Sequence, residues 1–283
     1  MKLLSPRFTR RWDWIRRFTR EAHTWRDRPA LALAGLARGR PFGGGSHYAR
    51  LGRGLAAQVA PRVRRAGGSR VRMDLTTVTD LMIFEEIFVD GVYPLEKVPF
   101  TPEVVIDGGA CTGCFTLLAH ARYPTARFIA VEPEPKNFAR LERHLRDNGI
   151  TAQCHAAALA EVPGNVRFTG SGFGGHITSG GSAASDLVVP ALSLSELIQA
   201  ATPARLLLKL DVEGMEQEIL PHLAVVLPAA TAIFLETHHP EDECQRYLAP
   251  LVSSGFAQCV IRSRPAPPPA MVYVERFLVR VCA

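Results

Sequence analysis

The sequence predicts an α/β fold, with a doubly wound, mostly parallel sheet that ends in an antiparallel hairpin. From residue 103 onward, short apolar runs with the character of buried strands alternate with segments that show helical apolar periodicity. Such alternation makes successive strands parallel, because each helix carries the chain back to the same end of the sheet. The last two apolar runs, 256–261 and 272–281, are joined by the proline-rich turn 265–269, which is too short for a parallel return. This pair is therefore predicted to be antiparallel.

The other elements follow from the same patterns. A short strand at 71–75 is expected before the sheet, and so is a helix that starts at Thr79 and Asp80, ends near Gly91 and flanks the core. Ser193 and Glu196 have the spacing of a capping box before a short helix. Further helices are expected at 135–148, 214–220 and 241–252, strands at 104–106, 128–131, 153–157, 166–168, 206–210 and 232–235, and a Gly- and Ser-rich loop at 170–185.

The most informative segment, 103–132, predicts a strand, a glycine-rich loop, a helix and a second strand. The first strand ends on Asp107 and the second on Glu132. The loop between the first strand and the helix contains glycines that let the backbone approach a ligand, namely Gly108, Gly109 and Gly113. The start of the following helix favours an anionic or polar group, and the distal carboxylate can accept hydrogen bonds from ribose hydroxyls. This arrangement indicates a nucleotide-binding site.

The same loop indicates which nucleotide binds. A dinucleotide fingerprint, G-x-G-x-x-G, needs glycine at its third position, but counting from Gly108 that position is Ala110. The carboxylate of Asp107, just before the loop, would repel a pyrophosphate but suits the ammonium group of S-adenosylmethionine. We therefore expect S-adenosylmethionine rather than a nicotinamide dinucleotide, and a nicotinamide-dependent oxidoreductase is the enzymatic alternative.

Four of the predicted strands end on an acidic residue: Asp107, Glu132, Asp211 and Glu236. In a doubly wound sheet, ligands bind at the carboxyl ends of the strands, so these four side chains are expected at one edge. The alternative is that all four only cap the next helices in the chain. Asp211 and Glu213 could together hold a divalent metal, but the sequence shows no third ligand, so no metal site is predicted.

The sequence resembles the FkbM family of S-adenosylmethionine-dependent methyltransferases, over about residues 74–281. The resemblance lies in VIDGGACTGCFTLLA (105–119), IAVEPEPKNFARLERHL (129–145), AAL (157–159) and LLKLDVEGMEQEIL (207–220). The segment Lys-x-Asp-Val-Glu-Gly at 209–214 is its most specific part, whereas most class I methyltransferases share the glycine loop. Two positions depart from the family pattern, since Cys111 stands where asparagine is common and Gly108 replaces a small apolar residue.

The resemblance implies a Rossmann-like class I methyltransferase fold with a seven-stranded sheet, and it implies roles by position. Donor-binding residues would be Asp107, Gly109, Ala110 and Gly113 for the methionyl part, Glu132 for both ribose hydroxyls, and Ala157 and Ala158 for the adenine. Asp211 would face the methyl-transfer centre. His238, just beyond the strand that ends on Glu236, is the second candidate base, followed by Glu213, Glu236 and His239.

These assignments predict an O-methyltransferase whose acceptor is a hydroxyl of a sugar, a glycolipid or a natural product. An alcohol is a poor acid and gains from a base within hydrogen-bond reach, while alignment on the sulfonium methyl supplies much of the rate. The non-enzymatic alternative is a methyltransferase-like module that binds its ligand without transferring a group.

The N-terminal part of the chain is strongly basic and the rest is not. We therefore expect a basic, partly flexible helical extension at 1–70 and a methyltransferase domain at 71–283. Residues 1–72 carry 18 Arg or Lys and 3 Asp or Glu, whereas the rest carries more acids than bases. Phe18 and Trp25 lie among these arginines, so a basic amphipathic helix could weakly contact an anionic membrane surface or a partner. No nucleic-acid-binding module is recognisable, so no nucleic acid partner is expected.

The sequence is that expected of a cytoplasmic protein, and it sets no oligomeric state. No apolar stretch approaches the ~20 residues of a membrane-spanning helix, and the first residues lack the continuous apolar core of a secretory signal. The six cysteines are scattered as in reduced proteins. The one close pair, Cys111 and Cys114, has no second pair or nearby histidine, so we expect packing rather than zinc or redox chemistry.

Overall fold

The computed structural model describes residues 13, 15–20, 28–29, 31–32, 71–75, 78–169, 176–178, 187–265 and 272–280. It divides into two compact units. One comprises Met1–Gly91 with Arg146–Gly149, and the other comprises Val92–Leu145 with Ile150–Ala283. All the predicted site residues belong to the second unit. Most of the predicted basic extension lies outside the described residues, so its boundary at residue 70 stays a prediction.

The first unit contains the helix that was predicted to end near Gly91. Helix α4 (Val78–Phe84) continues as the π-helical segment η1 (Glu85–Asp90). Gly91 closes this helix in the left-handed conformation, with a φ of 68°, and its N–H donates to the carbonyl of Glu86. The expected strand at 71–75 does not form, because the backbone N–H and carbonyl of Arg72 pair with the side-chain amide of Asn148 instead of with a neighbouring strand.

The second unit is built on a seven-stranded mixed sheet, as predicted. In spatial order the strands are β10 (Ala257–Pro265), β11 (Val272–Arg280), β9 (Ala230–Thr237), β8 (Arg205–Leu210), β1 (Val104–Gly108), β2 (Arg127–Val131) and β3 (Ala152–His155). Strands β9, β8, β1, β2 and β3 are parallel, whereas β11 pairs antiparallel with both β9 and β10. The C-terminal antiparallel hairpin is thereby confirmed.

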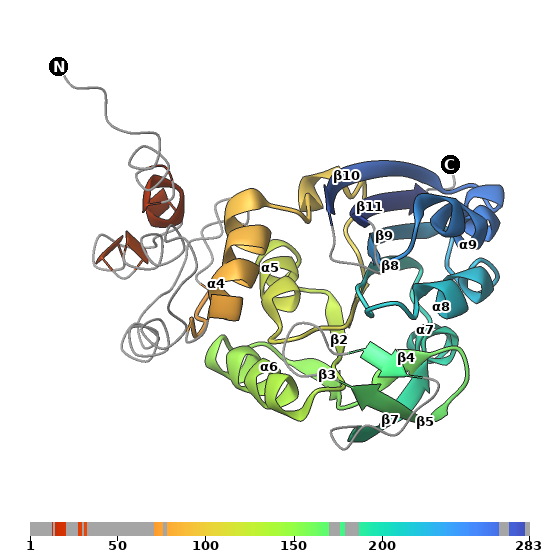
Figure 1. Cartoon of the computed structure of the whole chain (residues 1–283), viewed down its shortest axis with the longest axis horizontal. Helices are drawn as coiled ribbons and strands as arrows, with labels where there is room; N and C mark the ends of the chain where they lie inside the picture. Colours follow the sequence, from red (N-terminus) through yellow and green to blue (C-terminus); the bar gives the residue numbers. More distant parts are fainter. Residues whose placement is uncertain are drawn as a thin grey trace. The chain divides into compact units, whose positions relative to one another are not determined.

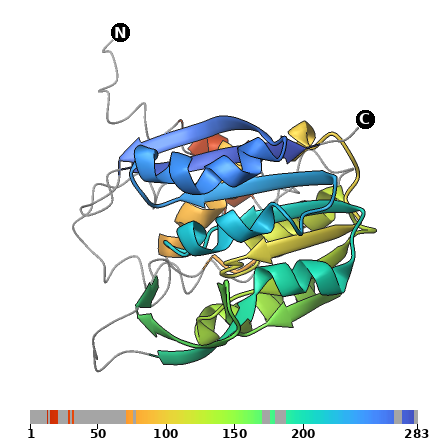
Figure 2. The same cartoon turned by 90° about the vertical axis from the view of Figure 1, so that its right-hand side faces the viewer.

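Helices cover both faces of this sheet, which explains the uninterrupted apolar runs of its central strands. Helices α5 (Cys114–Arg122) and α6 (Pro135–Asp147) lie on one face, and α7 (Leu194–Ala201), α8 (Glu216–Leu223) and α9 (Glu241–Ser253) lie on the other (Figures 1 and 2). The short 3₁₀ segment η2 (Leu95–Lys97) precedes β1. Leu206, Leu207 and Leu208 in β8 are fully buried between the two layers. The predicted capping box is confirmed, since Ser193 Oγ accepts a hydrogen bond from the Glu196 N–H at 3.3 Å.

A second, four-stranded sheet was not predicted. It contains, in spatial order, β4 (Ala158–Ala160), β7 (Leu187–Ser193), β5 (Gly164–Thr169) and β6 (His176–Thr178). The strand expected at 153–157 forms as β3 but ends at His155, and the next strand, β4, belongs to the small sheet. The expected loop at 170–185 lies mostly outside the described residues, and 176–178 forms β6 within it. Within the described ranges, no helix combines the length and apolar character needed to cross a membrane.

Candidate active site

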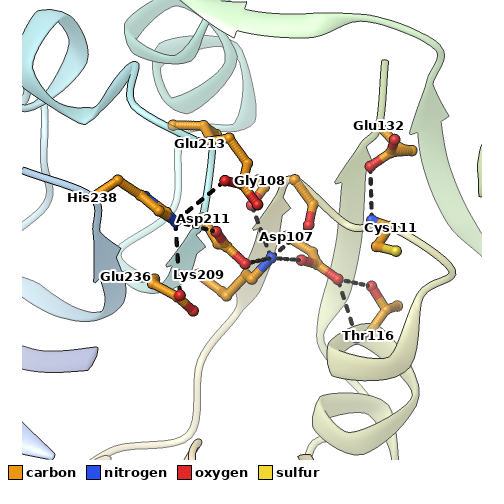
Figure 3. Close-up of polar contacts among 12 residues, drawn as sticks. Asp107, Gly108, Cys111, Thr116, Glu132, Lys209, Asp211, Glu213, Glu236 and His238 are labelled. Carbon is orange, nitrogen blue, oxygen red and sulfur yellow. Dashed lines mark hydrogen bonds and ion pairs between the residues drawn. The ribbon is translucent and has the colours of Figure 1, made fainter. Parts of the chain in front are cut away.

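The parallel strands bring their carboxyl ends to one edge of the sheet, where the candidate residues lie. Gly108 in β1 is level with Val131 in β2 and with Leu210 in β8, and Leu210 is level with Leu235 in β9. Residues next to these positions therefore share one edge, and they include the four acids singled out from the sequence: Asp107, Glu132, Asp211 and Glu236 (Figure 3).

The glycine-rich loop leaves β1 and folds tightly against the neighbouring strands. The N–H groups of Gly109 and Ala110 both donate to the carbonyl of Val131, at 3.0 and 2.9 Å. Gly109 has a φ of 71°, and a Cβ atom on it would lie 1.8 Å from the carbonyl oxygen of Asp211. Gly113 has a φ of 84° at the start of α5. Both positions therefore require glycine, and the loop is held against the end of β8.

Glu132 is buried at the end of β2, and its carboxylate is bound to the loop. Its Oε2 accepts a hydrogen bond from the N–H of Cys111 at 2.8 Å, and its Oε1 accepts one from the N–H of Glu134 at 2.9 Å. Burial raises the pKa of Glu132 to about 7, although these hydrogen bonds and the charge of Lys209 act in the opposite direction. Cys111 has a φ of 50°, a region that asparagine adopts more easily than cysteine. Burial and the nearby Glu132 charge raise the pKa of its thiol, so the thiol stays protonated.

Asp107 is 1% exposed and faces the interior of the unit rather than the solvent. Its Oδ2 accepts hydrogen bonds from Thr116 Oγ1 at 2.7 Å and from the Thr116 N–H at 3.2 Å. Its Oδ1 lies 3.5 Å from Lys209 Nζ. These contacts fix the start of the loop against both α5 and β8.

Lys209 connects the glycine loop to the end of β8, and sequence reasoning did not assign it to the site. Its ammonium group donates to the carbonyls of Gly108 and Gly109, at 3.1 and 2.5 Å. The same group lies between two carboxylates, 3.5 Å from Asp107 Oδ1 and 3.8 Å from Asp211 Oδ2. Burial alone would lower the pKa of Lys209, but these carboxylates outweigh it and raise that pKa. The available signal was a lysine inside an otherwise apolar strand.

On the other side of Lys209, His238 lies among four carboxylates from three parts of the chain. We call Asp211, Glu213, Glu216, Glu236 and His238 the His238 cluster. Nδ1 of the imidazole is 3.0 Å from Glu216 Oε1, and Glu216 is fully buried in the first turn of α8. Nε2 is 3.7 Å from Asp211 Oδ1, 3.5 Å from Glu213 Oε2 and 3.7 Å from Glu236 Oε1 (Figure 3). The structure thus brings together Asp211 and His238, the two candidate catalytic residues.

The electrostatics of the His238 cluster follow from this crowding. Burial alone would lower the pKa of His238, but its hydrogen bond to Glu216 and the charges of Glu216, Asp211 and Glu213 raise that pKa to about 10. Burial and the neighbouring Asp211 charge raise the pKa of Glu213 to about 7. The site therefore concentrates negative charge beside a single imidazole.

The remaining candidates are spread around this edge. Ala157 and Ala158, each 3% exposed, lie just before and at the start of β4, and the carbonyl of His155 at the end of β3 accepts a hydrogen bond from the Glu132 N–H at 3.0 Å. His239 packs edge-on against the ring of Tyr247 in α9, with ring centroids 5.7 Å apart.

Comparison with known proteins identifies the family. The family model for the methyltransferase FkbM domain matches residues 107–257. The methyltransferase sdnD of Sordaria araneosa is 31% identical over 174 residues, which are 49% of this chain and 66% of that protein. The 31-O-demethyl-FK506 methyltransferase FkbM of Streptomyces tacrolimicus is 33% identical over 88 residues, which are 31% of this chain and 34% of that protein.

Among solved structures, the precorrin-6y C5,15-methyltransferase of Geobacter metallireducens GS-15 is similar over 69% of this chain and 88% of its own, at 15% identity and a TM-score of 0.42. The chain spans less than two thirds of the length of the curated relatives named above. The family model, by contrast, covers more than half of the chain, from the end of β1 to the start of β10. The chain therefore belongs to the FkbM family of S-adenosylmethionine-dependent methyltransferases.

Proposed function

We propose that this chain transfers the methyl group of S-adenosylmethionine to a hydroxyl oxygen of a small-molecule acceptor. One observation carries the proposal. A buried lysine separates a nucleotide-type half-site, formed by the glycine loop and Glu132, from the carboxylate-rich His238 cluster. Lys209 Nζ lies within 3.5 Å of Asp107 on the first side and 3.8 Å of Asp211 on the second, so the two half-sites adjoin.

The donor side has the chemistry that S-adenosylmethionine needs. When bound, the donor supplies a methyl carbon that is electrophilic because it is attached to a sulfonium. Glu132 would accept hydrogen bonds from the ribose hydroxyls. The N–H of Cys111 holds its carboxylate in a fixed position at the loop. Gly109, Ala110 and Gly113 would hold the methionyl part, Asp107 would support it through the loop, and Ala157 and Ala158 would line the adenine. Asp107, which is anchored by Thr116 and Lys209, keeps the loop in place.

The acceptor side offers oxygen atoms that can take a proton. The Asp211 side chain is 27% exposed, so an acceptor hydroxyl can reach it, whereas Lys209 behind it is buried. Asp211 accepts the proton of the hydroxyl as the oxygen–carbon bond forms and the carbon–sulfur bond breaks, and the electron pair stays with sulfur. His238, the second candidate, lies 3.7 Å from Asp211 Oδ1 and acts as a positioning residue that orients this carboxylate.

Two observations support a hydroxyl acceptor: the carboxylates of the His238 cluster and the name of one relative. An alcohol needs a proton acceptor before it attacks, and a cluster of carboxylates supplies one. The name of the Streptomyces tacrolimicus relative specifies a 31-O-demethyl natural product as its substrate, which supports a natural-product hydroxyl here. Hydroxyls of sugars and glycolipids share the same chemistry and belong to the same proposal.

The test measures both transfer and the atom that is methylated. The chain is incubated with methyl-labelled S-adenosylmethionine and a panel of hydroxylated polyketide lactones and glycosides, each paired with an analogue whose hydroxyls are blocked. We expect S-adenosylhomocysteine and a labelled methyl ether only with the free hydroxyl compounds. A label on nitrogen or carbon would refute O-methylation. Donor binding without transfer to any compound would favour a binding module.

A further inference from the structure

We propose that Asp211, Glu213 and His238 form a binding site for a divalent cation on the acceptor side of the candidate active site. The catalytic role of the cation rests on the proposed function, whereas the binding site itself rests on contacts within the chain. From the sequence, Asp211 and Glu213 lacked a third ligand. The fold supplies that ligand as His238, which comes from a different strand end.

The spacing of the ligand atoms suits a cation. One atom from each of the three residues lies within 4.8 Å of the others. His238 Nε2 is 3.5 Å from Glu213 Oε2 and 3.7 Å from Asp211 Oδ1. A cation about 2.1 Å from each ligand places adjacent octahedral ligands about 3.0 Å apart and opposite ligands about 4.2 Å apart. The two separations from His238 Nε2 fall between these values, and the bound of 4.8 Å on all three atoms is only slightly above them, so small side-chain rotations would close the site.

His238 is oriented as a metal ligand would be. Its Nδ1 is 3.0 Å from the carboxylate of Glu216, a fully buried residue that also accepts a hydrogen bond from the N–H of Val212 at 3.2 Å. Ligating histidines commonly direct their other ring nitrogen to a carboxylate in this way, which fixes the tautomer and the ring plane. Nε2 is thereby directed to the carboxylates of Asp211 and Glu213. The side chain of His238 is only 8% exposed, so it is held in this position.

Orphaned carboxylate oxygens provide an independent observation. Asp211 Oδ1, the oxygen that faces His238, is fully buried and has no hydrogen-bond partner in the described part of the chain. Oε2 of Glu216, a residue with no exposed surface, is likewise without a hydrogen bond there. A buried carboxylate oxygen without a partner is costly, and a bound cation is one of the groups that removes this cost. Asp211 Oδ1 is also one of the atoms that the proposed cation would contact.

The charge balance favours a cation at the same place. Four carboxylates surround the single positively charged ring of His238 in the His238 cluster, and Lys209 approaches this cluster at Asp211 Oδ2, from 3.8 Å. The carboxylates outnumber these two cations, and a metal ion bound at Nε2 would replace the proton of the ring there. Carboxylates suit Mg²⁺ and Mn²⁺, and imidazole suits the transition metals, so the mixed set fits Mn²⁺ as a probe. Three protein ligands leave coordination positions open for the acceptor oxygen.

The cation would change the role of Asp211 in the reaction. Bound to the acceptor hydroxyl, it lowers the pKa of that hydroxyl, as divalent cations do for bound water. Asp211 then serves as a ligand through Oδ1. Glu236, whose Oε1 is 3.7 Å from His238 Nε2 and which the three-ligand site does not require, would accept the proton.

The test titrates Mn²⁺ alone into the metal-free full-length chain and measures the paramagnetic resonance of free Mn²⁺. Glu213→Gln is the deciding variant, because its side chain is 31% exposed and the change keeps its shape. His238→Gln reports on the nitrogen ligand. The matched control is His222→Gln, because His222 pairs with Glu161 at the surface, at 3.0 Å and with half of its side chain exposed. Circular dichroism verifies that each variant is folded.

We expect one Mn²⁺ per chain, with spin-echo modulation from a ligating nitrogen. Affinity should fall at least 10-fold in Glu213→Gln, the nitrogen modulation should disappear in His238→Gln, and His222→Gln should match the wild type. No saturable binding by the wild type, or equal affinity in Glu213→Gln and His222→Gln, would overturn the site. The titration contains neither donor nor acceptor, so its result does not depend on the proposed function. If the chain binds Mn²⁺ but does not bind S-adenosylmethionine, only the proposed function is refuted. Undiminished methyl transfer after chelation would refute the catalytic role of the cation alone.

Discussion

Replacing Glu132 with glutamine should weaken binding of S-adenosylmethionine by about 1.5–3 kcal/mol, which is about 10–150-fold in Kd. The carboxylate is 5% exposed and already receives the N–H groups of Cys111 and Glu134, so the ribose hydroxyls would bind a preorganised anion. Glutamine keeps the size and one acceptor oxygen but loses the charge that strengthens these hydrogen bonds.

The same residue predicts a pH dependence. Burial raises the pKa of Glu132 to about 7, so in the ligand-free protein the carboxylate is protonated below that pH and ionised above it. Donor affinity should therefore be full at high pH and decrease as the pH falls through 7, by about 10-fold at pH 6. Two other ionisable groups lie near the carboxylate. Lys209 stays charged and the Cys111 thiol stays neutral over this range, because both of their pKa values are raised.

Calorimetric titration of the donor from pH 6 to 9 measures both effects. The amino group of the donor also titrates in this range, so the informative quantity is the ratio of wild-type to Glu132→Gln affinity at each pH. Glu161→Gln, which changes an exposed carboxylate that pairs with His222, is the matched control and should behave like the wild type. A constant ratio across the range, or a Glu132→Gln variant that binds like the control, would refute the reasoning.

Three further substitutions test the contacts that hold the loop, each by denaturant unfolding of the full chain. Gly109→Ala should lower the free energy of unfolding by more than about 3 kcal/mol, because the added Cβ would lie 1.8 Å from the carbonyl oxygen of Asp211 and the φ of this residue is positive. A stability near that of the wild type would show that the glycine loop does not pack against Asp211. Lys209→Met should cost about 3–5 kcal/mol, since it leaves the buried carboxylate of Asp107 without its ion-pair partner; a loss below about 1 kcal/mol would contradict this. Thr116→Val should cost about 1–3 kcal/mol by removing the 2.7 Å hydrogen bond to Asp107, and an unchanged midpoint would contradict it.

The sequence was sufficient for the large sheet and for the placement of its strand-end acids. The buried strands are uninterrupted apolar runs, and a parallel sheet brings the residues at the carboxyl end of each run to one edge. Asp107, Glu132 and Asp211 were expected together for this reason. The hairpin was predictable because its connection is too short for a crossover. These features depend on local patterns and on one topological rule.

Other features depend on tertiary contacts that no local pattern carries. In the small sheet β7 pairs with β4 and β5 from well beyond them in the sequence, and β7 contains Pro190, which weakens its strand signal. The strand expected at 71–75 does not form because the backbone of Arg72 makes its hydrogen bonds to the side chain of Asn148. His238 follows β9, far along the chain from Asp211 and Glu213, so the third ligand of the proposed cation site became visible only in the fold.

The most direct test of the central claim is a single-turnover experiment on Asp211→Asn with labelled donor and an accepted hydroxyl compound. Because Asp211 is assigned to the acceptor side, the variant should bind S-adenosylmethionine with the wild-type Kd and transfer the methyl group about 10²–10⁴-fold more slowly. Transfer at the wild-type rate, or a loss confined to donor affinity, would contradict the division of this edge into a donor half-site and an acceptor half-site.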